Sequence, residues 1–112
     1  MSGNTFAGST EGYKNGTGTE AQFDEPFGVA VDSSGNLYVA DSNNHLIRKI
    51  TPRGVVSTFA GSGSSGIIGG GYKDATGTEA QFNYPRGVAV DSSGNLYVAD
   101  RKNHCIRKIE YK

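Results

Sequence analysis

Residues 23–50 have the sequence FDEPFGVAVDSSGNLYVADSNNHLIRKI. Residues 82–109 repeat it without a gap as FNYPRGVAVDSSGNLYVADRKNHCIRKI, with 22 identities in 28 positions at an offset of 59. A second match aligns Thr5–Gly8 with Thr58–Gly61. The interval between the two matched stretches is six residues longer in the second copy than in the first. The chain therefore contains two copies of one unit, with the extra residues in the Gly-rich stretch 61–71.

Each copy has the pattern of antiparallel strands joined by short turns. In the first copy, residues 28–31 and 37–40 are apolar and rich in strand-forming side chains, which predicts a hairpin. In the turn between them, Asp32 can accept hydrogen bonds from the following amides, and Gly35 can adopt the positive φ of a bulge. Asp91 and Gly94 occupy the same positions in the second copy. A turn over 41–45 and strands over 46–50 and 55–60 complete a predicted four-stranded meander, so the predicted fold class is all-β.

A short helical turn is predicted before the first strand of each copy. Thr19 and Gln22 have the spacing of a capping box, which would place Ala21 and Phe23 under the sheet. Thr78 and Gln81 repeat this spacing.

Length and composition restrict the class of protein. The 112 residues suffice for one small domain, and 11 basic residues balance 11 acidic ones, which disfavours binding driven by phosphate neutralisation. No window approaches the roughly 18 apolar residues of a membrane span, so no membrane partner is expected. The single cysteine, Cys105, cannot form an intrachain disulfide and is expected to act as a small hydrophobic residue.

The tripeptide Asn44-His45-Leu46 lies inside a longer frame, P-x-G-V-A-V-D, G-N-L-Y-V-A-D and N-H-L-I-R-K-I. This frame resembles that of NHL repeats, which are named for the tripeptide, and the chain resembles two blades of an NHL-type β-propeller. The resemblance implies four-stranded blades around a channel, usually six in a ring, with the first strand innermost. It divides the chain into blade units at about 19–61 and 78–112, either a segment of a longer propeller or a designed building block.

Two blades alone would leave one face of each sheet uncovered, so other chains are expected to complete the ring. Asn4–Gly8 matches the fourth, outer strand of a blade, whereas residues 106–109 form a third strand with no fourth after it. We expect residues 4–8 to pair with the blade of a neighbouring copy, which would cover an exposed strand edge. With six blades, the prediction is a homotrimer, and a four-chain ring of eight blades is the alternative.

Candidate binding residues lie in loops that the resemblance places on one face of the ring. They are also positions at which the two copies differ, so ligand preference could reside there. The set is Glu25, Phe27, Tyr84, Arg86, Ser42, Asn43, Arg101 and Lys102.

The remaining polar motifs are predicted to be structural. Asp41 with His45, and Asp100 with His104, could be metal ligands, but their recurrence in a turn favours capping by the Asp, worth about 1 kcal/mol, with the His packed across its hairpin. No catalytic residue, metal or cofactor is expected. The predicted function is a non-enzymatic, self-assembling scaffold or binding module.

Two alternatives remain open. One is a metal-dependent lyase-like or lactonase-like enzyme with a site shared between chains, and the other is an RNA-binding module. Basic residues cluster around the third strands, but we expect a solvated rim there, which makes nucleic acid an unfavoured partner. They are Arg48, Lys49, Arg101, Lys102, Arg107 and Lys108. Residues 61–66 satisfy G-x-G-x-x-G, but no helix can follow in 67–71, so a loop is predicted.

Overall fold

The computed structural model describes residues 3–61 and 82–110. The predicted all-β class is confirmed, because strands and single 3-10 turns make up the regular structure of these residues. The strands of the first copy are β1 (Gly16–Thr17), β2 (Pro26–Val31), β3 (Leu37–Asp41), β4 (Leu46–Ile50) and β5 (Val55–Ala60). Those of the second are β6 (Pro85–Val90), β7 (Leu96–Asp100) and β8 (Cys105–Ile109). The 3-10 turns are η1 (Gly18–Glu20), η2 (Ser42–Asn44) and η4 (Arg101–Asn103).

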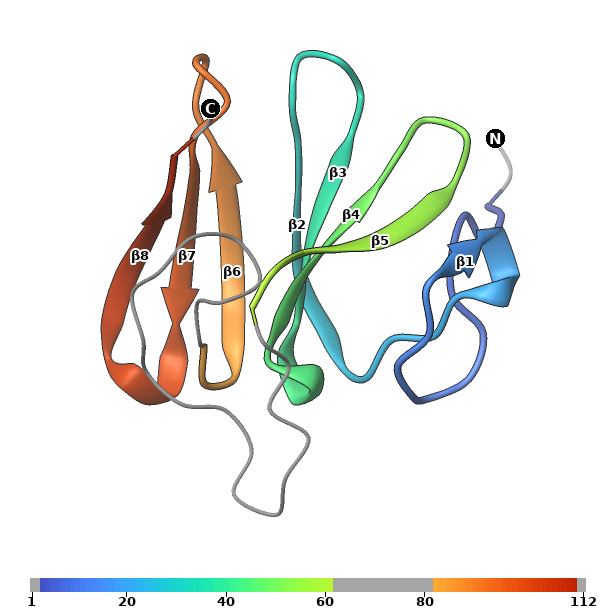
Figure 1. Cartoon of the computed structure of the whole chain (residues 1–112), viewed down its shortest axis with the longest axis horizontal. Helices are drawn as coiled ribbons and strands as arrows, with labels where there is room; N and C mark the ends of the chain where they lie inside the picture. Colours follow the sequence, from blue (N-terminus) through green and yellow to red (C-terminus); the bar gives the residue numbers. More distant parts are fainter. Residues whose placement is uncertain (1–2, 62–81, 111–112) are drawn as a thin grey trace.

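The strands form two antiparallel sheets, with orders β1-β5-β4-β3-β2 and β6-β7-β8. The sheets stand side by side as two blade-like units, with β2 and β6 adjacent (Figure 1). At their closest approach, a Cβ atom on Gly28 would lie 2.7 Å from the carbonyl oxygen of Arg86. A glycine is therefore needed for β2 to contact β6 this closely.

Both hairpin turns have the predicted geometry. Asp32 Oδ1 accepts hydrogen bonds of 2.9 Å from the backbone N–H groups of Ser34 and Asn36, and Gly35 has a φ of 88°. Asp91 and Gly94 repeat these contacts in the second copy.

The main core lies between the two sheets. The first sheet contributes Tyr38, Ala40, Ile47 and Ala60, and the second contributes Leu96 and Val98 around the buried Phe82, with Phe59, Val88, Val90 and Ile109 packed against them. A smaller core on the far face of the first sheet contains Ala21, Val39, Ile50 and Val56, with Ala7, Phe23 and Leu37 against it. The predicted packing of Ala21 and Phe23 under the sheet is thus confirmed.

The predicted start of the helical turn was wrong by two residues. The turn begins after Thr17, not Thr19, and the Thr17 N–H lies 3.5 Å from Glu20 Oε1. Pairing of β1 with β5, which the sequence did not predict, and a 2.8 Å bond from Gly18 N–H to Gly54 O hold this segment, so tertiary contacts set the start of the turn. Thr78 and Gln81 lie outside the described residues.

Residues 4–8 form no strand within the single chain, where the Gly8 N–H donates to Gly18 O at 3.1 Å. The predicted pairing joins two copies, so it stays a prediction. The G-x-G-x-x-G stretch and the inserted loop lie outside the described residues after Gly61.

Candidate functional site

The candidate binding residues come from one end of the two sheets. In the strand register, Pro26 pairs with Asp41 and Pro85 with Asp100. The start of β2 therefore lies beside the connection between β3 and β4, and the start of β6 lies beside the connection between β7 and β8. Both connections and both strand starts lie at the same end of the molecule (Figure 1). We call this end the loop face.

Aromatic and basic side chains interleave on the loop face. The guanidinium carbon of Arg86 lies 4.4 Å from the centre of the Phe27 ring, which is 52% exposed. The Arg101 guanidinium carbon and the Lys102 Nζ lie 5.7 and 6.0 Å from the centre of the Tyr84 ring. Phe27 and Arg86 both lie where the strand register shifts, at bulges that re-aim side chains. The structure thus brings these five residues together at one end, and their role in binding stays a prediction.

Ser42 and Asn43 contribute less to this surface. Ser42 lies in η2 at the loop face but is only 2% exposed, so its side chain offers little surface to a ligand. Asn43 donates through its backbone N–H to Asp24 O at 3.0 Å and through Nδ2 to Asp24 Oδ1 at 3.2 Å. These bonds tie η2 to the segment before β2. Glu25 is exposed, with a φ of 56°.

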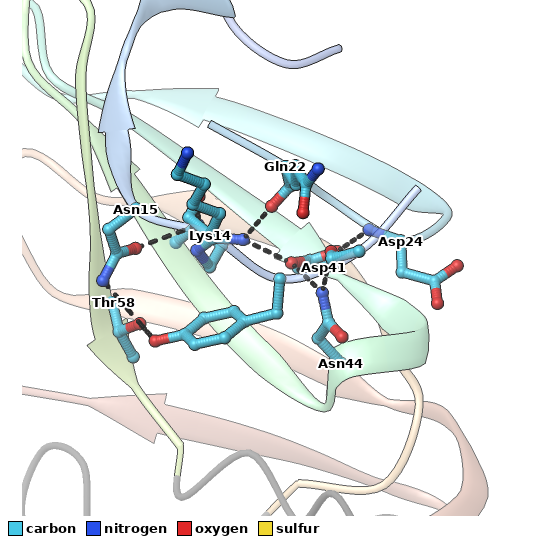
Figure 2. Close-up of polar contacts among 10 residues, drawn as sticks. Lys14, Asn15, Gln22, Asp24, Asp41, Asn44 and Thr58 are labelled. Atoms are coloured by element: carbon cyan, nitrogen blue, oxygen red, sulfur yellow. Dashed lines mark hydrogen bonds and ion pairs between the residues drawn. The ribbon is translucent and has the colours of Figure 1, made fainter. Parts of the chain in front are cut away.

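A buried ion pair joins Asp41 to Arg48, and it corrects the prediction of a solvated rim. The Arg48 NH1 lies 2.7 Å from Asp41 Oδ2, and both side chains are fully buried. The guanidinium also donates to Gln22 O, Lys14 O and Asn15 Oδ1, each at 2.9 Å. Figure 2 shows Asp41 among these groups, with the Asp24 N–H and Asn44 Nδ2 also bonded to its carboxylate. Burial raises the pKa of Asp41, against the effect of these donors.

The second copy repeats this pair at Asp100 and Arg107, again at 2.7 Å. Arg48 and Lys49 are adjacent in β4, so strand alternation places them on opposite faces of the sheet. The prediction was wrong about the exposure of Arg48. Arg48 shares a face of the sheet with Val39 and Ile50, and the N-terminal segment covers that face.

His45 makes a contact between the sheets and does not pack across its own hairpin as predicted. Its Nδ1 accepts a 3.0 Å hydrogen bond from the Tyr84 N–H, and its ring packs edge-to-face on Tyr84, with centroids 4.4 Å apart. Burial lowers the pKa of His45, and the charge of Asp100 opposes this shift. In the second copy, His104 is exposed.

Within residues 3–61 and 82–110, no group of three or more His, Cys, Asp or Glu side chains is arranged to hold a metal ion. None of the helical turns in these residues has the length and apolar character needed to cross a membrane.

Comparison with known proteins identifies the repeats. The NHL repeat family model matches residues 23–50 and 82–109, together half of the chain. The chain is 40% identical over 103 residues to NHL repeat-containing protein 2 of Bos taurus, and 38% identical over 100 residues to SUPPRESSOR OF QUENCHING 1 of Arabidopsis thaliana. Each alignment covers 88% of this chain, but only 14% and 9% of those proteins.

A solved structure is also similar. A putative phosphatase from Bacteroides thetaiotaomicron superposes with a TM-score of 0.81 at 31% identity, over 96% of this chain and 27% of that one. With the repeat frame found twice, in two adjacent antiparallel sheets, the chain belongs to the NHL repeat family.

Proposed function

We propose that this chain is a non-enzymatic scaffold that assembles with copies of itself into a closed ring of blades. The observation that carries the proposal is that its two outer sheet faces are the counterparts of the two faces that pack together inside the chain. A counterpart is the residue 59 positions away in the other copy.

The outer face of the second sheet, which we call the tail face, contains Tyr97 and Ile106. They are 36% and 70% exposed. Their counterparts Tyr38 and Ile47 are 6% and 0% exposed, because they pack against the second sheet. The tail face thus has the chemistry of a surface that is buried elsewhere in the same molecule.

The outer face of the first sheet, which we call the head face, contains Val29 and Val31. They are 60% and 59% exposed, whereas their counterparts Val88 and Val90 pack against the main core. Head and tail lie at opposite ends of the molecule, beyond β2–β5 and β6–β8 respectively (Figure 1).

A head-to-tail contact repeated by rotation closes into a ring when the angle between copies divides the circle. The six-blade habit of the family favours three chains of 11.8 kDa each. Among residues 3–61 and 82–110, β8 is the last strand of its sheet. Pairing of residues 4–8 of a neighbouring copy with β8 would complete a four-stranded blade there.

Size exclusion with light scattering tests the proposal. We expect the mass of a trimer, about 35 kDa by the closure argument, and a mass of four chains would support the eight-blade alternative. Ile106→Asp should yield folded monomers, because it places a carboxylate in the apolar contact. Ser92→Asp, in an exposed turn, is the matched control and should leave the mass unchanged. A monomeric mass for the cooperatively folded parent chain would overturn the proposal.

A second candidate function is binding of single-stranded RNA on the loop face. It is favoured by the stacking of Arg86 on Phe27 and by Arg101 and Lys102 near Tyr84, since single-strand binders combine aromatic and basic side chains. Fluorescence anisotropy with a labelled RNA oligonucleotide tests it. Binding that persists at 200 mM salt and weakens in Phe27→Ala would support it, and loss near 50 mM would indicate only nonspecific attraction.

A further inference from the structure

Two polar groups in the described residues lack the partner that their counterparts have. The Tyr84 N–H donates to His45 Nδ1 at 3.0 Å. Its counterpart, the Glu25 N–H, has no hydrogen-bond acceptor among residues 3–61 and 82–110, and the ring of His104 makes no hydrogen bond there either. The unpaired donor belongs to the head end and the unpaired acceptor to the tail end.

The backbone around both groups already has the conformation of the paired copy. Glu25 and Tyr84 have φ values of 56° and 55°, and His45 and His104 both have 57°. A non-glycine residue at positive φ has a conformational cost and keeps this conformation only where its surroundings hold it there. Both halves of the contact are therefore preformed in the single chain.

Gly8 and Gly61, which align between the two copies, also have similar backbone conformations and surroundings. Gly8 and Gly61 have φ values of 100° and 103°, and a Cβ atom on them would lie 3.1 and 3.2 Å from the rings of Phe23 and Phe82. A Cβ on Gly61 would also lie 2.8 Å from His45 O, whereas a Cβ on Gly8 meets no backbone atom within 4 Å among residues 3–61 and 82–110.

A hollow occupies the corresponding place at the head end. It is lined by residues that include Thr5, Gly8, Phe23, Asp24 and Glu25. At the equivalent place inside the chain, the backbone of His45 and the side chain of Leu46 contact Gly61. The hollow therefore corresponds to the space that His45 and Leu46 occupy inside the chain, and it is unfilled.

We infer that His104 of one copy docks into this hollow of the next copy, where its Nδ1 accepts a hydrogen bond from the Glu25 N–H. The inference rests on the proposed ring. It names the polar contact that aligns each junction, by which we mean the contact between two adjacent sheets, whether within a chain or between copies. Because Nδ1 must accept, His104 is neutral there, with the proton on Nε2. Ile106 follows on the same strand and packs its apolar side chain toward Val29 and Val31.

The two kinds of junction differ at one side chain. Inside the chain, the His45 ring packs edge-to-face on Tyr84, at an interplanar angle of 80°. Between copies, the residue opposite His104 is Glu25, which has no ring. Glu25→Tyr should therefore reproduce the internal junction and strengthen association by about 2- to 10-fold per junction, the usual range for an aromatic pair.

The experiment measures the association of full-length chains over a concentration series by analytical ultracentrifugation. His104→Phe keeps a ring of similar shape but removes the acceptor, and should weaken association by about 2- to 10-fold per junction. Glu25→Tyr should strengthen it, and Ser92→Ala is the control that should change nothing. Circular dichroism checks that each variant keeps the fold.

The outcomes distinguish failure of the His104 contact from failure of the proposed ring. If the parent chain forms a ring but neither His104→Phe nor Glu25→Tyr changes its association, the inference is overturned and the ring stands. If the parent chain stays monomeric at every concentration, the ring proposal fails, and this inference fails with it.

Discussion

At the scale of single residues, the Asp41–Arg48 pair dominates the polar interior of the first sheet. Its charges are fully buried, and the guanidinium reaches the backbone of the N-terminal segment as well as Asp41. The aromatic rings of Tyr13 and Phe23 each lie 4.8 Å from the guanidinium carbon. Such a pair costs free energy to bury but is strongly destabilising when one partner is removed.

We therefore predict that Asp41→Ala lowers the free energy of unfolding by about 3–5 kcal/mol, because Arg48 would remain as an uncompensated buried charge. This exceeds the roughly 1 kcal/mol expected for a turn cap. Urea denaturation measures the change. Asp32→Ala, in a solvated turn, is the control, and its free energy of unfolding should fall by less. Equal losses for the two variants would contradict the assignment.

We predict that the stability of the fold depends on pH through His45. Burial lowers its pKa below the usual 6.5, so the folded state favours the neutral ring that accepts from the Tyr84 N–H. The resulting stability is complete above about pH 6.5 and is lost as the pH falls through that value toward the lower folded pKa, because the unfolded chain then binds the proton first.

The check is the free energy of unfolding at pH 7.5 and 5.5 for the parent chain and for His45→Phe. The variant should be less stable at pH 7.5 but should lose less on acidification. An identical loss in both proteins would show that other groups cause the pH dependence.

At the scale of elements, the contact between β2 and β6 depends on Gly28. A Cβ there would lie 2.7 Å from Arg86 O and 3.0 Å from Gly87 Cα, both backbone atoms that cannot move without displacing β6. Gly28→Ala should lower stability by about 1–3 kcal/mol through overpacking.

Thermal unfolding measures this change, and Gly87→Ala is the matched control. A Cβ on Gly87 would make an ordinary contact of 3.7 Å with Ala99 Cβ, so that variant should unfold close to the parent temperature. A similar drop for both variants would mean that strand propensity, and not the contact between strands, is responsible.

At the scale of the whole molecule, the decisive question is what covers the head and tail faces. Deleting residues 1–8 removes the segment expected to pair with β8 and also Gly8, which lines the hollow. We expect light scattering to show that the shortened chain no longer forms the ring while its β-sheet dichroism is largely retained. A ring of unchanged mass from the shortened chain would disprove strand exchange through residues 4–8.

The strands, their turns and the repeat could all be predicted from local residue types. The turn at Asp32–Asn36 forms from contacts within five residues, and its copy forms the same turn at Asp91. These features depend on neighbours in the chain and on strand pairing across short turns, so local residue types suffice to specify them.

In contrast, packing between distant segments sets which polar residues are buried and which contacts join the sheets. Arg48 bonds to Lys14 and Asn15, and His45 bonds to Tyr84, across 34, 33 and 39 positions. The start of η1 likewise depends on the pairing of β1 with β5. Nothing in the local pattern marks these partners, because burial is set by what the folded chain places over a face, and that depends on packing between segments far apart in the sequence.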